Sequence, residues 1–246
     1  MDVDVRLFGG LASRARRTVV HITLPDPARV ADLRAAVASQ VPEIAGLLDA
    51  VKVAVDLEVA GLDVAVTQDS EVALLPPVAG GSDDDLPGDT HVDVPPTLER
   101  VDGFAMLTGL MAPPIDVESA LAAIVSPSVG GTVLFLGTVR DHAPDLDGVV
   151  GLDYSVYPDM ARRVLADTAR AVAVDHPEVT GIALLHAVGE LTVGEHTILV
   201  ACASAHRAAA FAACEDALER VKRDTPVWKR ERTMDGAHRW VGLPDA

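Results

Sequence analysis

The chain has 246 residues, a length that allows one or two domains, and its 49% hydrophobic and 23% charged residues are typical of a globular protein. No apolar run reaches the roughly 18 residues of a membrane span, and the net charge of −17 argues against general nucleic-acid binding. Cys202 and Cys214 are too few for a disulfide framework or a four-cysteine zinc site. These observations predict a cytoplasmic protein without a metal centre, with both cysteines buried.

Residues 1–81 have the pattern of a small α+β domain. Alternating apolar residues at 3–7 predict a strand, and residues 19–24 read as its partner. Apolar positions at helical spacing predict a helix over 30–41, which Pro42 ends. Three short strands are expected at 51–55, 64–66 and 72–75. Their order is that of a ubiquitin-like β-grasp fold.

Residues 82–99 contain six acidic residues and no Lys or Arg, with Pro and Gly but no apolar periodicity. Such a segment is typical of a solvated connection, so a flexible acidic linker is predicted here.

Residues 100–246 alternate between strand-like and helix-like segments, which predicts a two-layer α/β domain. Strands are expected at 104–107, 132–137, 152–156, 182–187 and 197–203. The nearly all-apolar strand at 132–137 is expected to be buried on both faces. Helices are expected at 116–124, with Asp116 as its cap, at 160–174, and from Ser204 to before Pro226. The apolar stripe of the last helix would be Phe211, Cys214, Leu218 and Val221.

Seven of the thirteen cationic residues in this second part fall between Arg220 and Arg239, against three acids. A basic island in an acidic protein indicates a local anion site, with a salt-bridged helix end as the alternative. Pro226 turns the chain between Lys222 and Lys229, so the two amines could converge. A Lys among other cations can serve as nucleophile or proton donor.

Two further cationic groups lie where strands end. Arg140 follows the apolar strand and can hold a phosphate through two parallel hydrogen bonds, unless it pairs with a surface acid such as Asp141. His206 and Arg207 stand at a helix start, where backbone N–H groups and the helix dipole favour an anion.

Gly80 and Gly81 end the run Leu74-Leu75-Pro76-Pro77-Val78-Ala79-Gly80-Gly81 and meet the acidic segment at once. A Gly-Gly pair alone usually marks a turn. After a β-grasp pattern, a tail without side chains could also thread a narrow active site, with its carboxylate as the reactive group.

Residues 1–81 resemble the small sulfur-carrier subunit of molybdopterin synthase, and residues from about 100 to 242 resemble its large catalytic subunit. The resemblance rests on that tail and on six ordered pieces of the second part. These are Phe135-Leu136-Gly137-Thr138-Val139-Arg140, Tyr157-Pro158-Asp159-Met160, Gly189-Glu190-Leu191, Ser204-Ala205-His206-Arg207, Pro226-Val227-Trp228-Lys229-Arg230-Glu231 and Arg239-Trp240-Val241.

The resemblance implies a ubiquitin-like sulfur-carrier domain at 1–81, a linker at 82–99 and a two-layer hammerhead-type catalytic domain at 100–246. The tail glycine, Gly81, would be adenylated and converted to a thiocarboxylate by a separate loading enzyme. Its sulfur would pass to cyclic pyranopterin monophosphate, two transfers giving the dithiolene of molybdopterin, without a cofactor.

By position, the resemblance makes Lys222 and Lys229 catalytic and makes Arg140, His206, Arg207 and Phe135 substrate-binding. It also implies a homodimer of the catalytic domain, with His206 and Arg207 able to come from the neighbouring copy.

One feature departs from the family. Ser82 follows Gly81, so Gly81 has no free carboxylate unless a protease cuts the chain there. Two alternatives are a sulfur-carrier or protein-modifier module fused to a docking domain, and a structural fusion with an inactive site.

Overall fold

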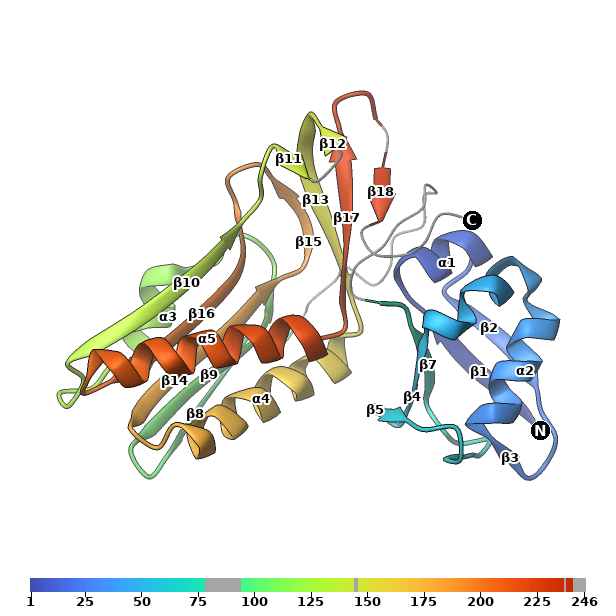
Figure 1. Ribbon diagram of the computed structural model, residues 1–246, viewed down its shortest axis with the longest axis horizontal. Coiled ribbons are helices and arrows are strands. Elements are labelled where there is room, and N and C mark those ends of the chain that lie inside the picture. The colour runs from blue at the N-terminus through green and yellow to red at the C-terminus, as the bar shows by residue number, and fades with distance from the viewer. Residues whose placement is uncertain (78–93, 144–145, 237, 241–246) are drawn as a thin grey trace. The chain divides into compact units, whose positions relative to one another are not determined.

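A computed structural model of the protein describes residues 1–77, 94–143, 146–236 and 238–240 (Figure 1). The chain forms two compact units. Unit 1 comprises residues 1–89, 155–157 and 226–246, and unit 2 comprises residues 90–154 and 158–225. Unit 1 therefore combines the N-terminal part with two short segments from later in the sequence.

The N-terminal part of unit 1 is built on a five-stranded sheet of order β2-β1-β7-β4-β5. Its strands are β1 (Asp2–Leu7), β2 (Val19–Thr23), β4 (Lys52–Val55), β5 (Glu58–Ala60) and β7 (Val72–Leu75). β1 runs parallel to β7, and the other neighbours are antiparallel. Val3, Val5 and Leu7 are buried in β1 while residues between them are more exposed, as their alternation predicts.

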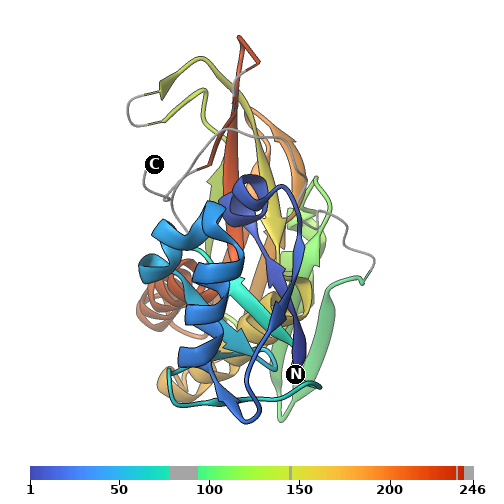
Figure 2. The same cartoon turned by 90° about the vertical axis from the view of Figure 1, so that its right-hand side faces the viewer.

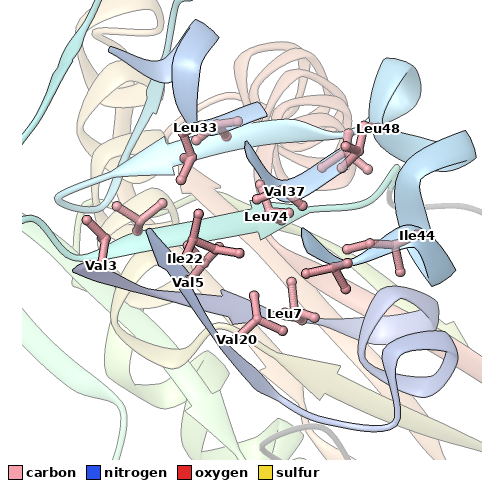
Figure 3. Close-up of a cluster of buried hydrophobic side chains, with 14 of the residues drawn as sticks. Val3, Val5, Leu7, Val20, Ile22, Leu33, Val37, Ile44, Leu48 and Leu74 are labelled. Carbon is pink, nitrogen blue, oxygen red and sulfur yellow. The ribbon is translucent and has the colours of Figure 1, made fainter. Parts of the chain in front are cut away.

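Helices cover one face of this sheet. They are α1 (Gly9–Ala15), α2 (Val30–Gln40) and the 3-10 helix η1 (Pro42–Ala50), which appear in blue in Figure 2. Leu33 and Val37 of α2 and Ile44 of η1 pack with strand residues in a single core (Figure 3). A short ladder of β3 (Ala28–Arg29) and β6 (Ala65–Val66) completes the expected β-grasp fold. The sequence did not predict helices α1 and η1.

A hairpin from the C-terminal part belongs to the same unit. Strands β17 (Val227–Thr233) and β18 (His238–Trp240) pair antiparallel, with Arg230 opposite Trp240. Pro226 precedes β17, and its carbonyl accepts a hydrogen bond from the backbone N–H of Tyr157 at 3.1 Å.

Unit 2 contains a five-stranded sheet of order β10-β16-β14-β9-β8. The strands are β8 (Thr97–Val101), β9 (Phe104–Met111), β10 (Gly131–Thr138), β14 (Val179–Ala187) and β16 (His196–Ser204). Helices α4 (Pro158–Asp175) and α5 (Arg207–Asp224) lie on one face and α3 (Val117–Ile124) on the other (Figure 1). This is the two-layer core with an additional helix on the second face.

Four further strands pair outside the main sheet of unit 2. β13 (Val149–Val156) pairs with β15 (Gly189–Thr192), and β11 (His142–Ala143) pairs with β12 (Leu146–Asp147). Asp116 caps α3 as predicted, accepting a hydrogen bond from the backbone N–H of Ser119 at 3.0 Å. None of the helices in the described ranges combines the length and apolar character that a membrane crossing requires.

Three sequence predictions about unit 2 were wrong in detail. β10 is not buried on both faces: among the described strands it is the edge of its sheet, paired with β16, and Leu134 is 36% exposed. Ser204 ends β16 instead of capping α5, whose N-cap is His206. Phe211 is 63% exposed, because it lies outside the buried side of α5, which consists of Ala210, Ala213, Cys214, Ala217 and Val221.

The predicted linker, residues 82–99, overlaps the described part only at its end. Residues 82–93 lie outside the described residues, and β8 begins at Thr97, inside the predicted range. The domain limits remain a prediction from the sequence.

Candidate active site

Lys222 lies in the last turn of α5, where a positive charge complements the helix dipole. Its Nζ atom is 5.6 Å from the centre of the Phe135 ring on β10. The structure thus brings together two residues that the sequence assigned to the site. The neighbouring Arg223 makes two hydrogen bonds to the carboxylate of Asp224, at 3.0 and 2.7 Å.

Lys229 lies in β17 and has a different environment. Its Nζ atom is 3.2 Å from Oε1 of Glu231, two residues along the same strand. Glu231 is only 2% exposed, and Arg239 approaches its other oxygen at 3.9 Å. A buried carboxylate therefore holds the ammonium group of Lys229 in place, which suits a residue that binds an anion more than one that moves.

His206 and Arg207 begin α5, as N-cap and first helical residue, and both are exposed. The first backbone N–H groups of a helix have no intrahelical acceptor, so this end attracts anions. Ser204 closes the strand before it, its hydroxyl donating to the carbonyl of Glu178 at 2.8 Å.

The two ends of α5 are far apart. Fifteen residues separate Arg207 from Lys222, which at 1.5 Å per residue is about 22 Å. Extended Lys and Arg side chains do not bridge that distance. In a single copy of the chain, the predicted catalytic amine and the predicted His-Arg pair do not meet.

Arg140 lies beyond the other end of β10. Gly131 pairs with Ser204, next to the start of α5, whereas Thr138 pairs with His196 at the far end. The register shifts between Gly137 and Thr138, and a Cβ atom at Gly137 would lie 2.6 Å from Oγ1 of Thr197. The glycine is thus required for the close strand pairing that precedes Arg140. Nine residues at about 3.3 Å put Arg140 roughly 30 Å from Gly131.

Gly80 and Gly81 lie outside the described residues, but the start of their tail is fixed. The carbonyl of Pro76 accepts a hydrogen bond from the indole Nε1–H of Trp228, at 3.0 Å. The ring of Phe8 stacks on Trp228 and on Tyr157, with centroids 5.0 and 4.9 Å apart. Tyr157 and Trp228 belong to two of the motifs that carry the family resemblance.

A polar network surrounds this aromatic stack. The hydroxyl of Tyr157, a fully buried residue, donates to Oε1 of Glu71 at 2.5 Å. The same oxygen accepts from Arg6 at 3.0 Å, and the Arg6 guanidinium lies 5.1 Å from the Tyr157 ring centre. Sequence reasoning missed Arg6, Phe8 and Glu71. The one available signal was Phe8, a rare aromatic residue directly before two glycines.

Three other side chains of reactive types, those of Cys202, Cys214 and His186, are buried. Cys202 and Cys214 are buried, as predicted, and their mutual hydrogen bond together with burial raises the pKa of the Cys202 thiol. His186 is buried against Tyr154, and burial lowers its pKa to about 4. Among the described residues no cluster of His, Cys, Asp and Glu is suited to hold a metal ion.

Comparison with known proteins gives two family matches in different parts of the chain. Residues 5–81 match the ThiS family, and residues 110–224 match the MoaE protein family. The "Molybdopterin synthase catalytic subunit" of Nostoc sp. is 34% identical over 158 residues, covering 64% of this chain and 92% of that protein. The chain belongs to the molybdopterin synthase catalytic subunit family.

Other members are similar to the same degree. "Molybdopterin synthase catalytic subunit 1" of Mycobacterium tuberculosis is 38% identical over 129 residues, covering 52% of this chain and 86% of that protein. The crystal structure of molybdopterin synthase from Staphylococcus aureus superposes with a TM-score of 0.50 and 30% identity, covering 58% of this chain and 99% of that one.

Unlike a separate catalytic subunit of molybdopterin synthase, this chain also carries a ThiS-type sulfur carrier in the same polypeptide. The chain is therefore an enzyme of molybdenum cofactor biosynthesis, with its carrier fused to its catalytic part.

Proposed function

We propose that this chain transfers sulfur from a thiocarboxylate on Gly81 to cyclic pyranopterin monophosphate, at a site built around Lys222. The observation that supports this most is the fixed start of the tail. Trp228 binds the Pro76 carbonyl, and Lys229 is the next residue of the same strand. The tail that ends in Gly81 thus starts at the strand that also carries one of the two predicted catalytic amines.

The surroundings of Lys222 and of Lys229 indicate different roles for the two amines in this proposal. Lys222, lying over the Phe135 ring, is the amine that acts as nucleophile or proton donor in the transfer. Lys229, fixed by Glu231, and Arg140 bind the anionic substrate. In each transfer the sulfur forms a bond to a pterin carbon, and water then cleaves its bond to the Gly81 carbonyl carbon and supplies the oxygen that returns Gly81 to a carboxylate. Two loaded tails are therefore consumed for each dithiolene formed.

A second copy completes the site. His206 and Arg207 lie at the opposite end of α5 from Lys222, so in this proposal they reach the substrate bound by a neighbouring chain. The partly exposed edge strand β10 and the exposed Phe211 are surfaces suited to such a homodimer.

Two further proteins act on the chain in this proposal. An adenylating enzyme loads sulfur onto Gly81, and a protease first cuts between Gly81 and Ser82 to free the carboxylate. We place these steps in the cytoplasm, as the sequence predicts. The alternative of a modifier fused to a docking domain is less favoured, because the relatives of the second part are catalytic subunits.

The test is to replace Lys222 in cells that lack their own synthase. Lys222→Ala should abolish cofactor synthesis, because losing a general acid or base typically costs about 100-fold or more in rate. Arg223→Ala is the matched control: it removes a charge from the same helix turn and should keep full activity. Cofactor synthesis at the wild-type level in Lys222→Ala would disprove the assignment.

A further inference from the structure

Trp228 binds the backbone at the base of the carrier tail. It is 3% exposed, and its indole N–H donates to the carbonyl of Pro76. Pro76 is itself buried and lies five residues before Gly81. Because a backbone carbonyl accepts this bond, the contact fixes the position of the main chain at Pro76 and does not depend on the neighbouring side chains.

Gly9 makes room for this contact. Its φ angle of +52° is in the left-handed region, and a Cβ atom there would lie 3.1 Å from Cγ of Trp228. Phe8, the preceding residue, stacks on the same indole. The carrier fold therefore contacts Trp228 through the ring of Phe8 and leaves room for it at Gly9.

The chain contains one other tryptophan, and it makes a similar bond elsewhere. Trp240 donates its indole N–H to the hydroxyl of Ser13 in α1, also at 3.0 Å, and is also 3% exposed. Both tryptophans thus tie the C-terminal hairpin to the N-terminal fold. The bond from Trp228 is made to the base of the tail, whereas the bond from Trp240 is made to α1.

We propose that Trp228 is a positioning residue, which fixes the point from which the sulfur-carrying tail extends. This inference rests on the proposed function. From Pro76 the five residues that end in Gly81 span at most about 16–18 Å. If Pro76 is held in place, Gly81 can lie no farther from it than this length. The reactive group at Gly81 is then confined to a smaller volume than it would be on an unanchored tail. Restricting the reacting group in this way accelerates a transfer step.

The first experiment measures the anchor without any activity. With two tryptophans, the ¹H–¹⁵N spectrum of the full chain has two indole signals, and Trp228→Phe assigns them. The Trp228 indole proton should exchange slowly with solvent. Gly9→Ala should shift this signal and speed its exchange, while the Trp240 signal stays. Gly103→Ala is the control, because Gly103 has a φ of +84° but nothing within 4 Å.

The second experiment measures transfer in single turnovers of the processed, thiocarboxylated chain with cyclic pyranopterin monophosphate. Trp228→Phe keeps an aromatic ring and loses the hydrogen bond, so the maximal rate should fall roughly 3- to 10-fold, as expected for one neutral hydrogen bond. The concentration of pterin for half-maximal rate should not change. Trp240→Phe, which loses the bond to Ser13, should transfer at the wild-type rate.

Three results would overturn the positioning role. They are a Trp228 indole proton that exchanges as fast as free indole, a Trp228→Phe chain as fast as wild type, and equal losses in Trp228→Phe and Trp240→Phe. The last would show that the hairpin only docks the carrier. If wild type transfers no sulfur to the pterin, the proposed function itself is wrong, and the exchange data still report on the anchor.

Discussion

At the scale of single residues, Lys222 and Lys229 look alike in sequence and differ in the structure. Lys222 is exposed at a helix end with an aromatic ring beneath it, whereas Lys229 is held by a buried carboxylate. The sequence could place both amines in a basic island. It could not separate their roles, because the burial of Glu231 beside Lys229, which distinguishes the two amines, depends on the tertiary fold.

This difference predicts different kinetic defects. Lys229→Ala should mainly raise the KM for the pterin substrate, by roughly 10-fold or more, since hydrogen bonds to charged groups are worth about 1.5–3 kcal/mol. Its kcat should fall less than that of Lys222→Ala. Steady-state kinetics of the two variants check this, with Arg223→Ala as control. A kcat loss in Lys229→Ala equal to that in Lys222→Ala would assign both amines to the chemical step.

His186 predicts a pH dependence of stability. Its pKa of about 4 in the folded chain lies below the usual 6.5. As pH falls below about 6.5, the unfolded chain binds a proton that the folded chain does not, so the free energy of unfolding decreases until about pH 4. A shift of this size corresponds to about 3 kcal/mol.

Denaturant unfolding of wild type and His186→Asn between pH 4 and 7 measures this effect. The wild-type free energy of unfolding should fall more steeply with acid than that of the variant. His21→Asn, at a side chain 80% exposed, is the matched control. Parallel curves for wild type and His186→Asn would show that burial does not lower the pKa of His186.

At the scale of elements, most of the fold was predictable because the local signals and the tertiary packing agree. α2 runs over Val30–Gln40 and α3 follows its Asp116 cap, as the apolar spacing and the capping residue indicated. The errors occurred where burial depends on distant partners. β10 reads as a central strand because it is apolar, but within the described part of the chain it lies at the edge of its sheet. Phe211 likewise lies outside the buried side of α5, which only the packing of the helix determines.

Helix α5 predicts that two copies share each site. In a mixture of Lys222→Ala and Arg207→Ala chains, half of the exchanged dimers contain one site with both native residues. Activity should then recover to about a quarter of wild type, provided that the dimers exchange freely. Each variant alone should stay near zero or well below wild type. A mixture of Lys222→Ala with Lys222→Gln cannot form a native site and is the control.

The outcome separates two geometries of the site. Recovery only in the first mixture means that Lys222 and Arg207 act from different chains. If that mixture is no more active than the average of its components, the two residues do not combine across copies, and His206 and Arg207 must serve another anion.

At the scale of the whole molecule, the fusion creates a chemical problem that separate subunits do not have. The carbonyl carbon of Gly81 is bonded to the nitrogen of Ser82 and has no carboxylate to activate. Sulfur loading therefore requires that this bond be cut. After cleavage, the contacts of Phe8, Glu71 and Pro76 with Tyr157 and Trp228 would keep the carrier associated with the segments that bind it.

The most direct test follows one sulfur atom. The chain is loaded at Gly81 with ³⁵S, its mass is determined, and it is incubated with cyclic pyranopterin monophosphate. We predict that label enters the pterin only from carrier that ends at Gly81, and that it remains on the carrier in the Lys222→Ala chain. Transfer from a chain still joined to Ser82, or undiminished transfer in Lys222→Ala, would contradict the account.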